Sequence, residues 1–208
     1  MANAIDTHHR RSIRLKDYDY SHAGAYFVTI CTQERVCLFG QVVDGKMRLH
    51  EYGEYIVRWW DDIPRHFSAV DIDVFVVMPN HIHGLIVITD EPVGAGLPRP
   101  ESNAPPHAGH TTSGSATPGE VTSPLPLRRP SLGNVVAYFK YQSAKHINTS
   151  RGIPGAFVWQ RNYYEHIIRN EASLNHIRQY ILDNPAHWTF DRENPEAVTP
   201  ERENAWLA

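Results

Sequence analysis

Residues 90–130 divide the chain into two parts, because Pro, Gly, Ser, Thr and Ala dominate this stretch and large apolar residues are few. Such a segment cannot bury enough surface to offset the entropy lost on ordering. We therefore predict a disordered insertion over residues 90–130 within one domain formed by residues 23–89 and 131–188. Residues 1–22 form a basic N-terminal arm, and residues 189–208 form an acidic C-terminal tail.

The apolar pattern of the two folded parts alternates between strand and helix. β-Branched and aromatic runs predict strands at residues 25–32, 70–78, 81–89 and 157–168. Helical spacing of apolar residues predicts helices at residues 51–66, 131–149 and 171–183. A hairpin or short loop is expected at Asp44 and Gly45. The order β-α-β-β-α-β plus a last helix is typical of an α+β, ferredoxin-like domain, whose antiparallel sheet is covered on one face by helices.

Charge is distributed unevenly along the chain. The formal net charge is −3, which by itself does not indicate a DNA-binding protein. From residue 131 to residue 170, however, Glu165 is the only carboxylate among several Lys and Arg residues. A basic surface of this kind can bind phosphates whatever the net charge of the protein, because the local field decides.

Several classes of protein do not fit the sequence. Cys31 and Cys37 match no zinc-binding spacing and suggest no disulfide framework. No apolar run approaches the ~18 residues that a membrane span requires, and the N-terminus lacks the apolar core of a signal peptide. No Gly-x-x-x-x-Gly-Lys-Ser/Thr loop for a nucleotide occurs. We expect a cytoplasmic protein.

The sequence Pro79-Asn80-His81-Ile82-His83-Gly84 is the densest candidate for chemistry. On a strand, His81 and His83 project from the same face, and two imidazoles placed in that way can bind one divalent cation. We interpret Gly84 as leaving open space beside them for a phosphate. The alternative is a pair of histidines on a solvent-facing strand, since so short a motif often occurs by chance.

A second candidate lies on the last helix. Tyr180 and Asn184 are four residues apart, so they share one face of the helix. The tyrosine hydroxyl can act as a nucleophile, and the asparagine amide oxygen is a hard ligand suited to Mg²⁺ or Mn²⁺. The alternative is a tyrosine that packs on the sheet and an asparagine that ends the helix. Tyr163 and Tyr164 compete as nucleophiles, and we favour Tyr180 because Asn184 lies one turn away.

A His-hydrophobic-His strand followed by a helix reading Tyr-x-x-x-Asn-Pro resembles the HUH single-strand DNA transposases of simple insertion sequences, and more narrowly the REP-associated tyrosine transposases. The likeness spans roughly residues 10–188 apart from the insertion. It is carried by residues 17–20, 26–30, 77–83 and 159–169 and by the Tyr180 helix.

This resemblance implies a role for each matching residue. His81, His83 and Asn184 would hold one Mg²⁺ or Mn²⁺, and Tyr180 on a C-terminal catalytic helix would be the nucleophile. The implied activity is that of a metal-dependent transposase and endonuclease, which cleaves and rejoins hairpin or single-stranded DNA through a 5′-phosphotyrosine. The protein would act as a monomer or homodimer. Candidate DNA contacts are Arg10, Arg11, Arg14, Lys140, Lys145, Trp159, Arg161 and Arg169.

Three alternatives stay open at this point. A non-cutting nucleic-acid-binding regulator could share the fold. A metal-dependent hydrolase could use water in place of Tyr180. An RNA-binding ferredoxin-like domain would need aromatic residues on its central strands and would leave the histidine pair unexplained.

Overall fold

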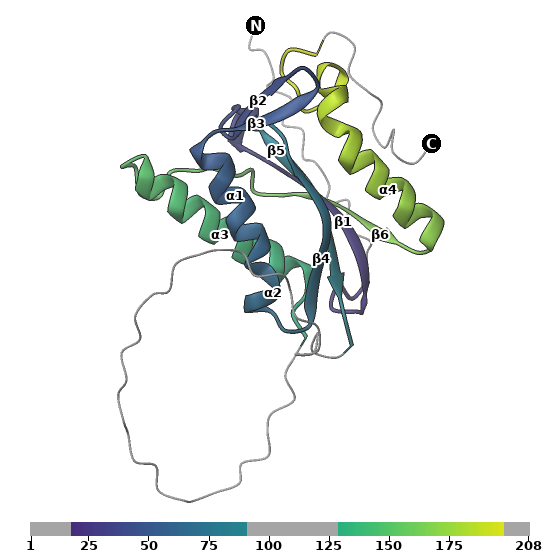
Figure 1. Cartoon of the computed structure of the whole chain (residues 1–208). Helices are drawn as coiled ribbons and strands as arrows, with labels where there is room; N and C mark the ends of the chain where they lie inside the picture. The colour runs from purple at the N-terminus through teal and green to yellow at the C-terminus, as the bar shows by residue number, and fades with distance from the viewer. Residues whose placement is uncertain (1–17, 91–128, 198–208) are drawn as a thin grey trace, which may run out of the picture.

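The computed structural model describes residues 18–90 and 129–197 (Figure 1). Most of the predicted insertion, at residues 91–128, lies outside the described residues, as do the candidate DNA contacts Arg10, Arg11 and Arg14 of the N-terminal arm. Within the described part of the chain, no helix has both the length and the apolar character that crossing a bilayer requires.

The helices and strands follow the predicted order. Along the chain they are β1 (Gly24–Cys31), η1 (Gln33–Arg35), β2 (Gly40–Val43), β3 (Lys46–Leu49), α1 (Glu51–Asp61), α2 (Ile63–His66), β4 (Val70–Val77), β5 (His81–Ile88), α3 (Leu132–Ser150), β6 (Tyr164–Ile168), α4 (Glu171–Asp183) and η2 (Asn184–Phe190). The main sheet has the order β4-β5-β1-β6, with every neighbouring pair antiparallel, and β2 and β3 form a separate hairpin. The predicted α+β class with a four-stranded antiparallel sheet is confirmed.

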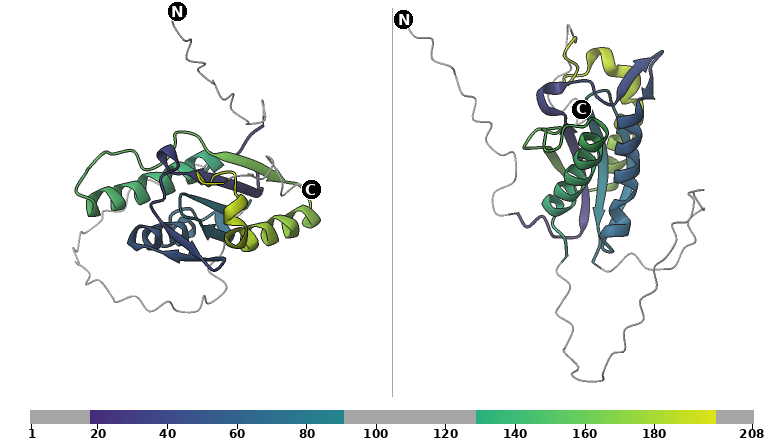
Figure 2. Two further views of the ribbon diagram at one scale, coloured as in Figure 1. Left: turned by 90° about the horizontal axis from the view of Figure 1, so that it is seen from above. Right: turned by 90° about the vertical axis from the view of Figure 1, so that its left-hand side faces the viewer.

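The two faces of the sheet carry different helices. On one face Trp60 of α1 and Phe139 of α3 pack with Ile82 and Ile86 of β5 in the larger core. On the other face Ile177 and Ile181 of α4 pack against Phe27 and Leu85. Figures 1 and 2 show α1 and α3 on one side of the sheet and α4 on the other. Because alternate residues of β5 face opposite layers, His81 and His83 lie on the same side as α4.

Local sequence explains where α3 and α4 begin. Ser131, the predicted first cap, accepts a hydrogen bond from the Asn134 amide at 3.2 Å, and Asn170 accepts one from the Ser173 amide at 2.8 Å. Side-chain oxygens at these positions satisfy amides that have no partner within the helix. The boundaries of both helices therefore agree closely with those predicted.

Two elements are shorter than predicted. The helix expected over residues 51–66 is divided at Asp62, just ahead of Pro64. The strand expected over residues 157–168 begins only at Tyr164. Ahead of it, the ammonium of Lys140 donates to the carbonyls of Gln160 and Arg161 at 2.5 and 3.1 Å. Those carbonyls bind a side chain instead of a neighbouring strand, so the ladder is interrupted.

The interpretation of Gly84 as space for a phosphate is wrong. A Cβ at this position would lie 2.4 Å from Cζ2 of Trp60 and 3.1 Å from Cβ of Phe75. Gly84 follows His83 directly, so it faces the opposite layer of the sheet, where the ring of Trp60 lies against its backbone. The glycine serves packing between sheet and helix.

Candidate active site

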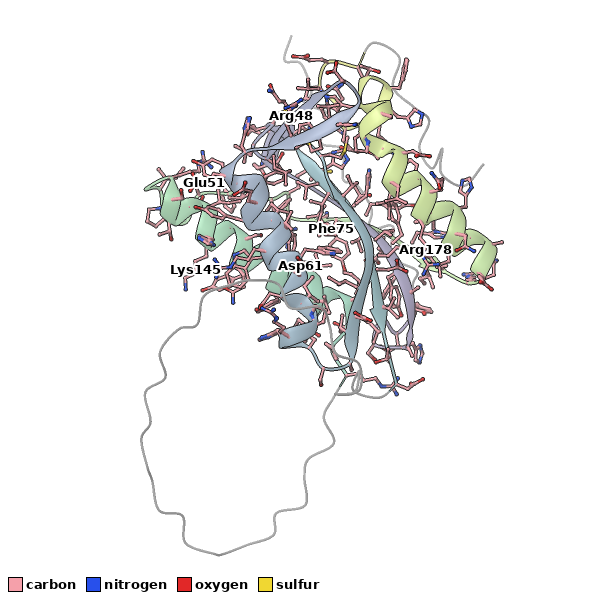
Figure 3. The ribbon with its side chains drawn as sticks, in the orientation of Figure 1. Arg48, Glu51, Asp61, Phe75, Lys145 and Arg178 are labelled. Atoms are coloured by element: carbon pink, nitrogen blue, oxygen red, sulfur yellow. The ribbon has the colours of Figure 1, made fainter. Side chains whose placement is uncertain are left out.

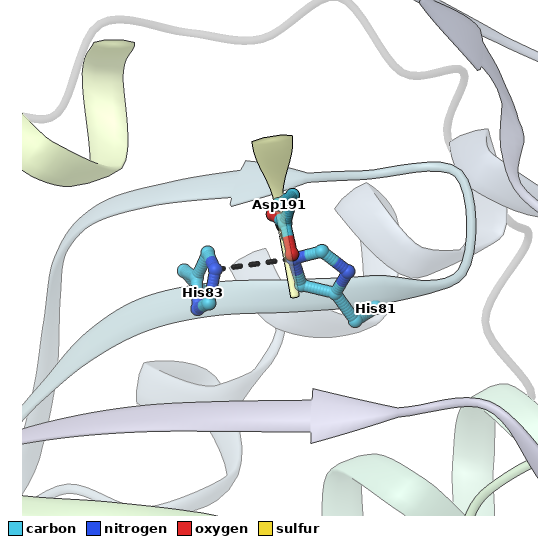
Figure 4. Close-up of side chains that lie close together, drawn as sticks. All are labelled: His81, His83 and Asp191. Carbon is cyan, nitrogen blue, oxygen red and sulfur yellow. Dashed lines mark hydrogen bonds and ion pairs between the residues drawn. The ribbon is translucent and has the colours of Figure 1, made fainter. Parts of the chain in front are cut away.

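The predicted histidine pair lies together at the start of β5. The Nε2 atoms of His81 and His83 are 3.1 Å apart, and the two side chains are almost fully buried (Figure 4). Burial lowers the pKa of each imidazole from its usual value to about 3, and each ring is therefore neutral near pH 7. A neutral imidazole has one nitrogen with a free lone pair, as a metal ligand requires.

Asn80 determines which nitrogen of His81 carries the proton. Its side-chain nitrogen faces two backbone carbonyls, those of Arg35 at 3.0 Å and Glu193 at 2.7 Å. The amide oxygen must therefore face Nδ1 of His81, 2.8 Å away, and accepts a hydrogen bond from it. With the proton on Nδ1, the lone pair of His81 is on Nε2 and points toward His83.

His83 is held from the neighbouring strand. Thr29 of β1 lies opposite it in the sheet register, and the Thr29 hydroxyl is 2.8 Å from its Nδ1. The ring of Phe27 stacks on the imidazole with 5.5 Å between centroids. These two contacts from β1 fix the plane of the ring, as partners of metal-binding histidines commonly do.

A buried carboxylate, Asp191, completes the cluster. Its Oδ2 lies 3.5 Å from Nε2 of His81, and one ligand atom from each of His81, His83 and Asp191 lies within 4.8 Å of the others (Figure 4). Among the described residues, Oδ2 has no hydrogen-bond partner. Burial raises the pKa of Asp191, because nearby protein replaces the water that would solvate its charge. These three side chains can offer two nitrogens and one oxygen to a single cation.

Sequence reasoning missed Asp191, which it placed in the acidic tail. The residue lies just beyond η2 and is only 5% exposed. One signal was available, since Trp188 precedes it closely and tryptophan is typical of packed structure. The Trp188 ring indeed lies near His81, with 6.1 Å between centroids.

The structure places Tyr180 beside the histidine pair. Its ring centroid is 5.4 Å from that of His83 and 6.2 Å from that of Phe27, and the side chain is half-buried. Arg178 on the same helix donates from Nε to Asp73 of β4 at 2.9 Å, which anchors α4 to the sheet. Figure 3 labels Arg178 on the side of the sheet opposite Lys145 of α3.

Asn184 begins η2 and is 3% exposed. Its Oδ1 is buried and has no hydrogen-bond partner within residues 18–90 and 129–197. The residues one turn to either side, Tyr180 and Trp188, have their rings near His83 and His81, respectively. Asn184 therefore lies between two residues whose rings are near the histidines, and its buried oxygen is left without a hydrogen bond within the described part of the chain.

Comparison with known proteins gives one close relative. No family model matches the chain. A Haemophilus influenzae protein described as uncharacterized is 40% identical over 185 residues, which cover 89% of this chain and 93% of the relative. The chain belongs to the same family as that protein.

Two solved structures are also similar to the chain. A REP-associated tyrosine transposase bound to a REP hairpin has 17% identity and a TM-score of 0.48, with 84% of this chain and 73% of that chain covered. A candidate transposase from Deinococcus radiodurans has 18% identity and a TM-score of 0.39, with 82% and 97% covered.

The candidate DNA contacts fall into two groups. Lys145, Arg161 and Arg169 are exposed. Trp159, by contrast, is only 6% exposed, packs against Phe39 and Phe139, and donates from Nε1 to Ser143 at 3.0 Å. The structure therefore does not place its ring where a base could stack. The ammonium of Lys140 is already hydrogen-bonded to backbone carbonyls and serves to hold residues 160–162.

Proposed function

We propose that the protein is a metal-dependent single-strand DNA transposase and endonuclease, which cleaves and rejoins hairpin-containing DNA through Tyr180. The observation that carries this proposal is the position of the Tyr180 ring, 5.4 Å from the ring of His83 and on the same face of the sheet as the histidine pair. A phenol from a helix and two imidazoles from a strand, far apart in sequence, thus meet at one site.

The donor atoms at this site fit a divalent cation. His81 directs a lone pair toward Nε2 of His83, and Asn184 has a buried oxygen that no described residue satisfies. The amide oxygen suits Mn²⁺ or Mg²⁺, and the two neutral imidazoles add nitrogen ligands of the kind that transition-metal ions such as Mn²⁺ accept. A cation held there would supply Lewis-acid polarisation of the scissile phosphate and would offset the charge that develops on its oxygens. His81, His83 and Asn184 are the proposed ligands.

The role of Tyr180 follows from its hydroxyl. The oxygen attacks phosphorus and forms a phosphotyrosine bond, the bond from phosphorus to the 3′ oxygen of the upstream strand breaks, and that oxygen takes up a proton. One phosphodiester replaces another, so the step can reverse to rejoin strands, and no nucleotide cofactor is needed. Because the pKa of a free tyrosine is about 10, the hydroxyl must lose its proton to a base at neutral pH.

The substrate that we propose is single-stranded or hairpin DNA. The resemblance of the His81-x-His83 strand and the Tyr180 helix to the REP-associated transposases implies hairpins. A base-paired strand would also be less accessible to a nucleophile that is half-buried on α4. Exposed Arg161 and Arg169, together with Lys145 on the side of the sheet away from the histidine pair, are the described candidates for contacts to phosphates, and such contacts would weaken as salt is raised.

The test is whether a covalent adduct forms on hairpin oligonucleotides with Mn²⁺. An oligonucleotide labelled at its 3′ end should migrate with the protein in a denaturing gel, whereas a 5′ label should appear on a released fragment. Tyr180→Phe should abolish both products, and Tyr163→Phe, which removes a competing tyrosine, should leave them intact. Cleavage by Tyr180→Phe without an adduct would instead establish a hydrolase. Binding by the wild type without cleavage would establish a regulator.

A further inference from the structure

The C-terminal segment from Asp191 to Glu193 lies against the histidine pair and is held there by contacts from two other parts of the chain. We propose that Asp191 is a further ligand of the cation, and that Asn80 and Arg35 clasp this segment on the site. Cation binding and docking of the segment are then a single coupled event. This inference rests on the proposed function only in taking the histidine pair as a cation site.

The two carboxylate oxygens of Asp191 lie in different surroundings. Oδ1 accepts a hydrogen bond from the backbone amide of Glu193 at 2.7 Å, which fixes the carboxylate within its own turn. Oδ2 is left facing Nε2 of His81 at 3.5 Å and has no hydrogen-bond partner among the described residues. A buried carboxylate oxygen without a hydrogen bond is costly, and a cation placed between it and the imidazoles would remove that cost.

Asp191 also supplies charge that the other donors lack. Two imidazoles that burial keeps neutral and one amide oxygen leave both positive charges of a divalent ion uncompensated. A carboxylate in the same buried cluster offsets one of them. Carboxylate oxygens are also the side-chain ligands that Mg²⁺ and Mn²⁺ favour.

The clasp consists of Asn80, Arg35 and Glu193. The guanidinium Nε of Arg35 lies 2.8 Å from Oε2 of Glu193, and the Asn80 side chain donates to the carbonyls of both residues. The same Asn80 side chain accepts a hydrogen bond from Nδ1 of His81. The buried side chain of Asn80 thus orients His81, which is one proposed ligand. It also holds the segment that contains Asp191, which is another.

The turn that carries Arg35 is strained. Glu34 and Arg35 have φ angles of 56° and 57°, in the left-handed region that residues other than glycine rarely adopt. Such a conformation persists only where surrounding contacts enforce it, and it is typical of functional sites. Here the strained turn presents both the carbonyl that Asn80 binds and the guanidinium that pairs with Glu193.

The experiment measures binding of Mn²⁺ to the full-length chain by calorimetry, with no DNA present. Asp191→Asn should weaken binding roughly ten- to hundredfold, and Glu193→Gln, which removes the ion pair with Arg35 but no ligand and leaves the Asn80 hydrogen bonds in place, should weaken it severalfold. Glu196→Gln is the matched control, because Glu196 is an exposed carboxylate three residues beyond Glu193 and takes no part in the clasp. Its affinity should equal that of the wild type.

Hydrogen exchange supplies a readout independent of affinity. Mn²⁺ should slow exchange of amides in residues 188–195 of the wild type and of Glu196→Gln, and should not slow it in Asp191→Asn. Unchanged exchange in the wild type, or an unchanged affinity in Glu193→Gln, would overturn the inference. These two measurements decide it even if Asp191→Asn does not fold.

These experiments distinguish a failure of the coupling between cation and segment from a failure of the transposase proposal. If wild type binds Mn²⁺ as described and forms no DNA adduct, the transposase proposal fails and the coupling stands. If Tyr180-dependent adducts form while Asp191→Asn binds Mn²⁺ like the wild type, the coupling fails and the transposase proposal stands.

Discussion

Replacing Gly84 by alanine separates two explanations of why a glycine follows the histidine pair. In the structure, the added Cβ would lie 2.4 and 2.7 Å from two atoms of the Trp60 ring. Trp60 cannot easily move, because it is fully buried, stacks on Phe75 at 5.4 Å and meets Phe139 at 5.3 Å. If Gly84 instead left room for a phosphate, alanine would impair DNA binding and leave folding intact.

The expected loss of stability is about 2 kcal/mol. Overpacking a well-filled core costs roughly 1–3 kcal/mol, and the rigid surroundings of Trp60 favour the upper end of that range. Gly84 is not in the left-handed region, so alanine recovers about 0.5–1 kcal/mol by restricting the unfolded chain. For a domain of this size, the net loss corresponds to a fall in Tm of about 4–8 °C.

Urea unfolding of Gly84→Ala, Trp60→Phe and the double variant measures this interaction. Phenylalanine lacks the outer ring of the indole, so the cost of Gly84→Ala should fall by at least ~1 kcal/mol in the Trp60→Phe background. Hairpin-DNA affinity of folded Gly84→Ala should match that of the wild type. An unchanged free energy of unfolding for Gly84→Ala, or an equal cost in both backgrounds, would refute the packing explanation.

Two further predictions concern the supports of the site. Thr29→Val, which keeps the shape of the side chain but removes the hydroxyl 2.8 Å from Nδ1 of His83, should weaken Mn²⁺ binding about tenfold in calorimetry. Its Tm should fall modestly, because Nδ1 of the buried His83 loses its hydrogen-bond partner, and undiminished Mn²⁺ affinity would show that Thr29 does not orient the ring. Asn170→Ala removes the cap of α4 and should lower the free energy of unfolding in urea by ~1 kcal/mol. An unaltered urea midpoint would contradict the capping role.

Most of the secondary structure of the domain could be predicted from the sequence, because helices and strands depend on patterns of neighbouring residues. Ser131 marks the start of α3, and Pro185 follows α4 closely, as side-chain capping and the geometry of proline require. The strand expected over residues 157–168 was too long. The ammonium of Lys140, which is distant in sequence, donates hydrogen bonds to the carbonyls of residues 160–162, so these carbonyls do not pair with a neighbouring strand. No local pattern reports such a long-range hydrogen bond.

Two side-chain pairs could be predicted from local sequence, His81 with His83 on one face of a strand and Tyr180 with Asn184 on one face of a helix, because they depend only on the periods of strand and helix. Packing between distant segments placed α4 on the histidine side of the sheet and Trp60 against Gly84 on the other side. It also brought Asp191 to the histidines. These three outcomes depend on contacts between residues distant in sequence, and no periodicity within a single segment encodes such contacts.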